Sequence, residues 1–508
     1  MWNTIVIGFG IGGLTAACAL ARRGQRVLVL EQHAVAGGMT QTFRRQGWTF
    51  ATGVHYIGGV GGESGAAGQF GRLLDWLSGG ALSLTPCGNP YDIVRLPGFE
   101  FGIEHPEAAY RAALLRRFPA QDAAIGRWFD EMESARRAAY ALMATRSMPS
   151  WSAWGLKLWR GSEIEHYRKR TLAEALAEVP DEQLRALLGA RWGDYGAPPD
   201  HAPLLEHALV TGSYNAGAFF PVGGPERFAQ ALRPVIEAAG GELRLGASVE
   251  RIVVRGGRAS GVVMRGPVGE QHETAGHVVS AMGVLNTAAC LDAGVAAAWQ
   301  QAVRALKPGL SYVSLYIGFE GDIAAAGASA ANLWVYESLD IGRTWHDPVD
   351  EDAPALFVSF PSMKDGAFSG APTAEVVVLC DSSSFAQWLH PVAGTPVADY
   401  AATKSWIEER LLAQFNQLFP ALAPLVRYHE LSTPVTQQRY VRSPDGAMYG
   451  VEMTSERLGT PALDVRTPLP GLLLAGQDVA GAGVQAAAMS GLMAAAAIEP
   501  ALLQQLGA

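Results

Sequence analysis

Residues 4–31 constrain the fold of this chain more than any other segment. They contain an apolar strand, a glycine-rich turn, an Ala/Leu-rich helix and a second apolar strand that ends in an acidic residue. In the turn, Gly8 permits a sharp change of direction, Gly10 lets the backbone approach a pyrophosphate, and Gly13 lets the helix pack closely on the sheet. The N–H groups that open the helix would hold the phosphate charge. The segment therefore predicts a dinucleotide-binding βαβ unit.

Two further segments indicate that the dinucleotide is FAD rather than NAD. Gly37 and Gly38 let the backbone pass close to a pyrophosphate and ribityl chain. Near the other end, the apolar run 472–474 would bring Asp478 to the same region, and a helix starting near Val484 would point its positive dipole end at the flavin ring. The alternative for this second segment is a buried strand and a core helix. The cofactor-binding residues predicted from these segments are Gly8, Gly10, Gly12, Gly13, Glu31, Gln32, Gly37, Gly38, Met39, Thr40, Gly476, Asp478 and Gln485.

Composition excludes several other classes of protein. A chain of 508 residues with 49% hydrophobic and 17% charged residues buries much of itself, and we expect two intertwined domains. The net charge is −9 and there is no basic run, so nucleic acid is not an expected partner. The four cysteines are scattered without a CxxC pair, so neither a disulfide nor a metal site is predicted. The absence of a secretory signal pattern favours the cytoplasm.

Residues 143–160 have the composition of a membrane-interface helix. Trp151, Trp154 and Trp159 lie beside Lys157 and other cations, and such amphipathic side chains suit the boundary between lipid and water. The alternative is an aromatic helix that acts as a lid over a substrate cavity. Either role suits a lipophilic substrate, and the first would place the protein at the inner face of a membrane as a peripheral protein.

The elements expected along the chain divide it into two discontinuous domains. Strands and helices typical of the dinucleotide unit return twice, which assigns 1–75, 222–300 and 455–508 to an FAD-binding domain. The intervening segments, 76–221 and 301–454, mix short apolar strands with helices and are expected to form a substrate-binding domain. The predicted fold class is α/β, with a Rossmann-type FAD-binding domain and a discontinuous α+β substrate domain.

Several segments together resemble one family of flavoproteins. They are Gly-Val-His-Tyr-Ile-Gly at 53–58, Phe-Pro-Val-Gly-Gly at 220–224, Val-Ser-Ala-Met-Gly at 279–283, Phe-Pro-Ser-Met-Lys-Asp at 360–365, the stretch 433–450, and Ala-Gly-Gln-Asp at 475–478. In this order they resemble the retinol saturase family, within the wider phytoene desaturase and carotenoid isomerase group. The resemblance implies a glutathione reductase/amine oxidase-like fold, noncovalent FAD and a conjugated polyene or isoprenoid-like substrate. It also implies that Val249 clamps the adenine through its backbone.

The chemistry that the resemblance implies is the addition of two hydrogens across one C=C bond, which requires a proton donor. His55 leads the candidates because His donates protons near neutral pH and this one follows the pyrophosphate glycines closely. Its neighbour Tyr56 is a second catalytic candidate. Tyr440, Tyr449 and Glu452 are candidates for the cavity wall, although each could equally serve packing or hydrogen bonding.

The electron source and the direction of the reaction stay open at this point. No second GxGxxG turn follows a strand, so reducing equivalents are expected from NAD(P)H that binds transiently, from an electron-donor protein, or from the substrate itself in an isomerisation. A desaturase or a cis/trans isomerase would use the same pocket. A third alternative is a lipid-binding escort protein similar to the Rab GDP-dissociation inhibitors, which share this fold without flavin.

Overall fold

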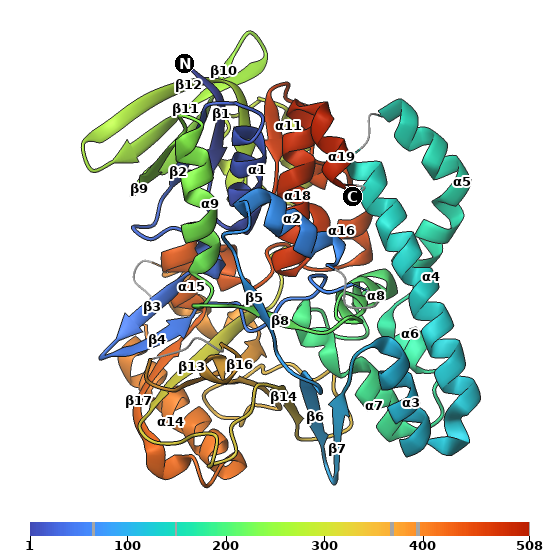
Figure 1. Cartoon of the computed structure of the whole chain (residues 1–508). Helices are drawn as coiled ribbons and strands as arrows, with labels where there is room; N and C mark the ends of the chain where they lie inside the picture. Colours follow the sequence, from blue (N-terminus) through green and yellow to red (C-terminus); the bar gives the residue numbers. More distant parts are fainter. Residues whose placement is uncertain (63–66, 148–149, 366–369, 393–396, 507–508) are drawn as a thin grey trace.

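The chain folds around two seven-stranded sheets (Figure 1). The structure is a computed structural model, and it describes residues 1–62, 67–147, 150–365, 370–392 and 397–506. The first sheet has the strand order β10-β11-β12-β1-β2-β9, with β18 paired to β12. Its strands are β1 (Trp2–Ile7), β2 (Val27–Glu31), β9 (Glu242–Leu245), β10 (Ser248–Arg255), β11 (Arg258–Gly266), β12 (Gly269–Ser280) and β18 (Leu472–Leu474). The parallel pairing of β2, β1 and β12 confirms the predicted dinucleotide unit.

Two helices of small residues pack against each other beside this sheet. Helix α1 (Ile11–Ala21) follows the glycine turn directly and is buried along its whole length. It contacts α18 (Gly483–Ile498), which confirms the predicted C-terminal helix. A Cβ atom on Gly491 would lie 2.1 Å from the carbonyl oxygen of Gly12, so the two helices approach as closely as they do because glycine occupies this position.

The second sheet has the order β17-β13-β16-β15-β14-β6-β7. Its strands are β6 (Asp92–Leu96), β7 (Phe99–Ile103), β13 (Ser311–Phe319), β14 (Asn332–Tyr336), β15 (Ala355–Ser359), β16 (Thr373–Cys380) and β17 (Val426–Ser432). The β6–β14 pair is parallel and joins segments that are 240 residues apart at Asp92 and Asn332. One face of this sheet presents Trp334, Tyr336 and Phe357 to a cavity that is described below.

The hairpin of β3 (Thr42–Arg45) and β4 (Trp48–Ala51) packs on the second sheet, although the sequence assigns residues 1–75 to the FAD-binding domain. Trp48 and Phe50 form a buried cluster with Tyr316, and the indole of Trp48 donates a hydrogen bond of 3.1 Å to the Phe319 carbonyl. The alternating aromatic residues of β4 give the hairpin an apolar face, and the second sheet offers the matching surface.

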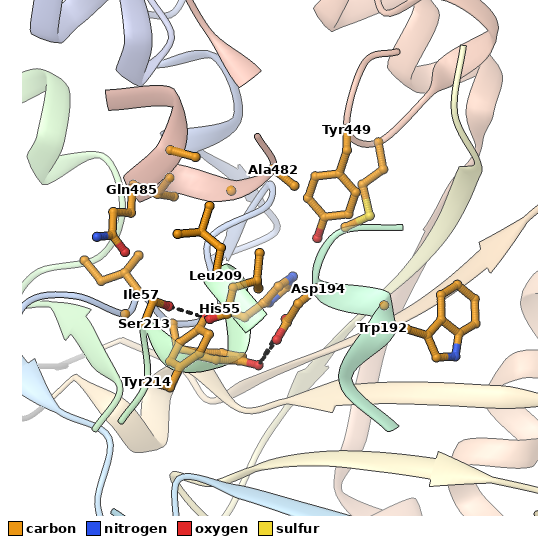
Figure 2. Close-up of a pocket in the computed structure, with 18 of the residues that line it drawn as sticks. His55, Ile57, Trp192, Asp194, Leu209, Ser213, Tyr214, Tyr449, Ala482 and Gln485 are labelled. Carbon is orange, nitrogen blue, oxygen red and sulfur yellow. Dashed lines mark hydrogen bonds between the residues drawn. The ribbon is translucent and has the colours of Figure 1, made fainter. Parts of the chain in front are cut away.

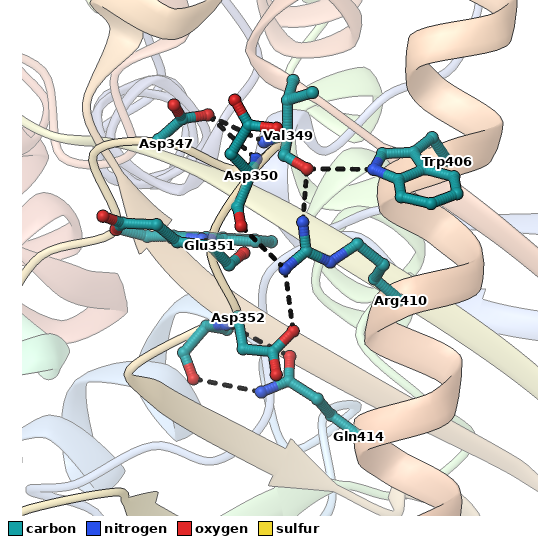
Figure 3. A network of polar contacts seen from close by, with 10 residues as sticks. Asp347, Val349, Asp350, Glu351, Asp352, Trp406, Arg410 and Gln414 are labelled. Atoms are coloured by element: carbon teal, nitrogen blue, oxygen red, sulfur yellow. Dashed lines mark hydrogen bonds and ion pairs between the residues drawn. The ribbon is translucent and has the colours of Figure 1, made fainter.

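A polar network fixes the loop that leads into β15 (Figure 3). Helix α14 (Tyr400–Leu418) presents Arg410 and Gln414 to this loop. Arg410 donates to the Asp352 carboxylate at 2.9 Å, and Gln414 exchanges two hydrogen bonds of 3.2 Å with the backbone of Ala353. Because residues 354–357 line the cavity, these contacts hold one of its walls in position.

Long helices form one flank of the molecule (Figure 1). Its elements are α3 (Glu107–Arg117), α4 (Asp122–Ser147), α5 (Ser150–Lys169), α6 (Leu172–Leu176), α7 (Glu182–Gly189), the 3-10 helix η4 (Ala190–Asp194) and α8 (Leu204–Gly212). Helix α5 packs against α4 and carries the exposed residues Trp154, Leu158 and Trp159. Of the predicted interface segment, residues 148–149 and the side chains of Trp151 and Lys157 lie outside the described part. Within the ranges described, no helix combines the length and apolarity needed to cross a bilayer.

Candidate active site

The glycine turn has the geometry of a pyrophosphate cradle. Gly8 adopts φ +92° and donates a backbone hydrogen bond of 2.8 Å to Leu30. A Cβ on Gly13 would lie 2.0 Å from the Gly8 oxygen, so a side chain there would destroy the turn. A Cβ on Gly10 would meet nothing within 4 Å. The space in front of Gly10 is therefore open to a ligand, whereas the protein itself fills the space around Gly13.

The second glycine pair lies beside this turn. Gly38 has φ +55°, and a Cβ on it would stand 2.9 Å from the Cα of Gly10. The Thr40 hydroxyl donates to the Gly37 carbonyl at 2.8 Å, which closes a short 3-10 turn, and the Met39 carbonyl accepts a hydrogen bond from Thr52. The two glycine segments thus lie side by side and form one surface, which is open at Gly10.

Glu31 and Gln32 follow the second strand and hold the neighbouring backbone. The Glu31 carboxylate accepts N–H groups from Phe9 at 2.9 Å and His33 at 2.7 Å. The side-chain amide of Gln32 donates to the Tyr440 carbonyl at 2.6 Å. Each carboxylate oxygen retains a further lone pair, so Glu31 can still accept a ribose hydroxyl.

Asp478 connects the first sheet to the substrate side of the molecule. Its two oxygens accept backbone N–H groups of Val284 at 2.8 Å and Val451 at 3.0 Å. The N–H of Gly476 donates to Ser490 on α18 at 2.7 Å. Val249, which the resemblance predicts to clamp the adenine, lies in β10 and pairs with Met264 of the antiparallel strand β11. The side chain of Asp478 therefore holds together the backbone segments that contain Val284 and Val451.

A cavity of about 620 Å³ lies between the start of α18 and the second sheet (Figure 2). Gln485 and Ala482 border it on the side of α18, and His55, Asp194 and Tyr449 border it elsewhere. Most of the remaining wall is apolar or aromatic, including Ile57, Trp192, Leu209, Trp334, Phe357, Val377, Leu379 and Met448. A cavity of this size and composition suits an extended apolar ligand with few polar groups.

His55 faces a buried acid at the edge of this cavity. Its Nδ1 lies 2.9 Å from Oε2 of Glu375 on β16, and the Glu375 side chain has no exposed surface. Oε1 of Glu375 accepts the N–H of Ala51 at 2.6 Å. The His55 ring packs edge-on against Phe357 at 5.1 Å between ring centroids. The structure thus places His55, the predicted proton donor, in the cavity wall, with an acidic partner that the sequence does not reveal.

Tyr56 joins two acidic residues from different parts of the chain. Its hydroxyl lies 3.0 Å and 3.1 Å from the two oxygens of Asp194, and 3.3 Å from Oδ2 of Asp92. Burial, with the charge of Asp92 added, raises the pKa of Asp194 to about 7. Burial and the charge of Asp194 raise the pKa of Tyr56 well above its usual value. Tyr56 is consequently a weak acid, whereas Asp194 can carry a proton at neutral pH.

Lys364 closes the polar layer behind the cavity. Its ammonium donates to the His55 carbonyl at 2.7 Å and to Ser359 at 2.6 Å, and it also contacts Asn332. Burial lowers the pKa of Lys364 to about 8. Arg191 is likewise buried and donates to the Tyr91 hydroxyl at 2.8 Å. These two cations offset the charge of Asp92 in this layer.

Among the remaining predicted residues, Tyr449 lines the cavity, whereas the prediction that Tyr440 and Glu452 do so is wrong. Tyr440 stands near the end of α15 (Pro434–Val441), where its ring is exposed and contacts His33 beside the FAD-binding sheet. Glu452 follows β-bridge residue Val451, and its N–H donates to the Lys307 carbonyl. The stretch 433–450 crosses from one sheet to the other, so its residues do not share one environment.

Sequence reasoning missed Asp194, Glu375 and Lys364. Asp194 follows a glycine within Arg-Trp-Gly-Asp-Tyr-Gly, which was a usable signal for an ordered acidic turn. Lys364 lies within one of the segments that carry the family resemblance. Glu375 sits in an otherwise apolar buried strand, and a lone acid in such a strand calls for a partner. Their meeting depends on the pairing of distant strands and could not be inferred from spacing.

This fold and glycine cradle define a flavin-binding oxidoreductase of the two-domain kind. The chain belongs to the family of flavin-containing amine oxidoreductases, whose model matches residues 11–499. It is 32% identical to all-trans-retinol 13,14-reductase of Macaca fascicularis over 98% of this chain and 85% of that protein. It is 22% identical to the chloroplastic prolycopene isomerase of Daucus carota over 97% of this chain and 79% of that protein. These matches confirm the resemblance to the retinol saturase family and to carotenoid isomerases.

The solved structure of cyclohexylamine oxidase from Brevibacterium oxydans IH-35A shares the fold. It superposes with a TM-score of 0.62 and 20% identity, and the match covers 98% of this chain and 99% of that one. The cofactor is FAD, as the match to the flavin-containing family shows. The open space at Gly10, the free N–H groups at the start of α1 and the adjoining Gly38 fit its pyrophosphate. The enzyme is thus an FAD-dependent oxidoreductase.

Proposed function

We propose that this enzyme saturates one C=C bond of a lipophilic conjugated polyene or isoprenoid-like molecule. The observation that carries this proposal is the cavity beside α18, which joins a long aromatic and aliphatic wall to a small polar corner at His55 and Asp194. The relatives named for reduction of retinol and isomerisation of prolycopene act on molecules of this chemical class. An apolar wall holds such a chain without needing specific hydrogen bonds.

Saturation needs a hydride and a proton on adjacent carbons. Reduced FAD, when bound, supplies the hydride. The protein's own residues would hold the polyene against the side of α18, exclude water through Trp334, Phe357 and Leu379, and keep a proton-bearing group at the polar corner. The two-electron balance is completed by an external reductant, for which we propose transient NAD(P)H or an electron-donor protein.

Anaerobic titration tests this function directly. The holoprotein is reduced with dithionite, excess reductant is removed, and all-trans-retinol or a carotene is added while the flavin absorbance is followed. Return of the oxidised flavin spectrum in proportion to added polyene supports reduction. A spectrum that stays reduced while the double-bond geometry of the polyene changes would instead assign the isomerase alternative. The flavin-free escort alternative is disfavoured, because the family match and the open Gly10 both indicate a bound flavin.

We further propose that α5 docks on a membrane surface. Trp154, Leu158 and Trp159 are 66%, 67% and 76% exposed, and their spacing places them on neighbouring positions of one helix. The Arg160 guanidinium lies 5.5 Å from the Trp159 ring centroid, which places a cation beside the exposed aromatic face. Helix α5 packs on α4, whose residues Tyr140 and Met143 border the cavity. A polyene would then pass from the bilayer to the cavity along α4.

A further inference from the structure

We propose that Asp194, rather than His55, gives the proton that completes saturation of the double bond. This inference rests on the proposed function and names the acid within the same cavity. Asp194 is the last residue of η4, and its side chain borders the cavity between Tyr449 and His55 (Figure 2). It therefore touches whatever fills that corner of the cavity.

The contacts of the Tyr56 hydroxyl require that one of two acids, Asp194 or Asp92, carries a proton. A phenol has one O–H, yet both Asp194 and Asp92 lie within hydrogen-bond distance of the Tyr56 oxygen. If Tyr56 donates to Asp92, a second proton between Tyr56 and Asp194 satisfies the remaining contact. Burial raises the pKa of Asp92 as well, but Asp92 also accepts the Asn332 amide at 3.1 Å and lies near the charges of Arg191 and Lys364, and these contacts favour its ionised form. The shared proton is accordingly assigned to Asp194.

The other polar groups of the cavity are poorer donors. Nδ1 of His55 lies 2.9 Å from Oε2 of the buried Glu375 side chain, so this nitrogen faces a protein partner rather than a ligand. Burial raises the pKa of both Tyr449 and Tyr214 above that of an ordinary phenol. A neutral carboxylic acid gives up its proton far more readily than such a phenol. The pKa of Asp194, about 7, lies at neutral pH, where a general acid works best.

Two charged groups act on Asp194, and they lie on different elements. Asp92 on β6 opposes its ionisation, and Arg191 on its own turn favours it. The other titratable groups nearby are Tyr56, Tyr195, Tyr214, Tyr336, Tyr449 and His55. Apart from His55 these are phenols with raised pKa values, so they stay neutral across the range in which Asp194 titrates.

The proposed step balances in atoms and electrons. The O–H bond of Asp194 breaks as a C–H bond forms at one alkene carbon, and the π electrons of the double bond supply that bond. Reduced FAD, when bound, would supply the hydride and its electron pair for the C–H bond at the other carbon. The Asp194 carboxylate then takes a proton from water, and the external reductant, dithionite in the test, restores the flavin.

The first measurement needs no substrate. Infrared difference spectra of the holoprotein between pH 5 and 9 should show a protonated carboxyl band that disappears with a midpoint near pH 7. Asp194→Asn should remove this band, whereas Asp200→Asn, a change six residues further on at an exposed side chain, should keep it. A wild-type spectrum without a carboxyl that titrates near pH 7 would overturn the assignment, whatever the enzyme's reaction.

The second measurement separates the donor from the function. With dithionite-reduced protein and all-trans-retinol, Asp194→Asn should slow flavin reoxidation by about 100-fold or more, and Asp200→Asn should leave it unchanged. The wild-type rate should also fall about tenfold per pH unit above pH 7, which tests the assignment even if Asp194→Asn fails to fold. A rate that is independent of pH from 6 to 9, or an Asp194→Asn enzyme as fast as wild type, would contradict it. If wild type itself reduces no polyene, the proposed function fails while the infrared titration still reports on Asp194.

Discussion

Nδ1 of His55 and Oε2 of Glu375 stand 2.9 Å apart, although 320 residues separate them in the chain and the Glu375 side chain has no exposed surface. Strand β16 brings the acid to the back of the cavity, and the Gly-Val-His-Tyr segment supplies its partner. A buried carboxylate without a compensating group is costly, so the pair ties the conformation of this cavity wall to the second sheet.

The first prediction concerns this pair. His55→Phe should lower the free energy of unfolding by roughly 3–5 kcal/mol, because it removes the imidazole that pairs with the buried Glu375 side chain. Adding Glu375→Gln to His55→Phe should recover much of that loss. Urea unfolding of the two single variants and the double variant, at fixed excess FAD, measures the coupling. The exposed Arg45–Glu430 pair is the matched control and should couple by less than about 1 kcal/mol. Equal coupling in the two pairs would contradict a structural role for His55–Glu375.

The second prediction separates two glycines of the same turn. Gly10→Val should yield a folded protein without flavin, because a side chain there meets no protein atom but occupies the space of the pyrophosphate. Gly13→Ala should instead fail to fold, since its Cβ would lie 2.0 Å from the Gly8 oxygen. Circular dichroism reports folding, and the ratio of flavin to protein absorbance reports occupancy. A yellow Gly10→Val protein would show that the cofactor lies elsewhere.

The third prediction is a dependence of stability on pH. An acid whose pKa is raised from 3.8 to about 7 on folding binds more protons in the folded than in the unfolded state between these values. Stability should therefore fall as the pH rises from about 4 to about 7, and the full loss persists above pH 7. At pH 8, Asp194→Asn should be more stable than wild type by roughly 2–4 kcal/mol, with no gain at pH 4. Denaturant unfolding at the two pH values checks the sign. Equal effects of the substitution at both would refute it.

The fourth prediction concerns the exposed face of α5. Changing Trp154 and Trp159 together to Ser should weaken binding to vesicles of mixed anionic and zwitterionic lipid by about tenfold or more, because two aromatic rings would no longer be buried in the interface. Val268→Ser is the control, since Val268 is 79% exposed in the turn between β11 and β12 of the first sheet. Co-sedimentation with vesicles gives the affinities. Unchanged binding of the double tryptophan variant would exclude α5 as the docking surface.

Much of the fold follows from local patterns in the sequence. The strand, glycine turn and helix at the N-terminus were predictable because Gly8 and Gly13 answer steric needs that the structure displays, and the apolar run 472–474 forms the buried strand β18. The packing of the β3–β4 hairpin on the second sheet was not predicted, because its contacts with Tyr316 and Phe319 join segments that are distant in the sequence. Sequence proximity to the FAD-binding glycines gave no information about packing.

The active site was less predictable than the fold. His55, Tyr56 and Tyr449 were found from their position near recognisable segments, and all three border the cavity. The buried acids were not found, because Asp194 of η4 and Asp92 of β6 come together only at the Tyr56 hydroxyl, and all three residues are distant in the sequence. Tyr440 shows the opposite error, since a helix turns it toward the FAD-binding sheet and away from the cavity.

The central claim is that a polyene is reduced in the cavity between α18 and the second sheet. Mass spectrometry of the product from one anaerobic turnover of the dithionite-reduced enzyme with all-trans-retinol tests it most directly. The account predicts a product heavier than the substrate by two hydrogens, in an amount that matches the flavin oxidised. Recovery of retinol with unchanged mass, whether or not its geometry has altered, would contradict the claim.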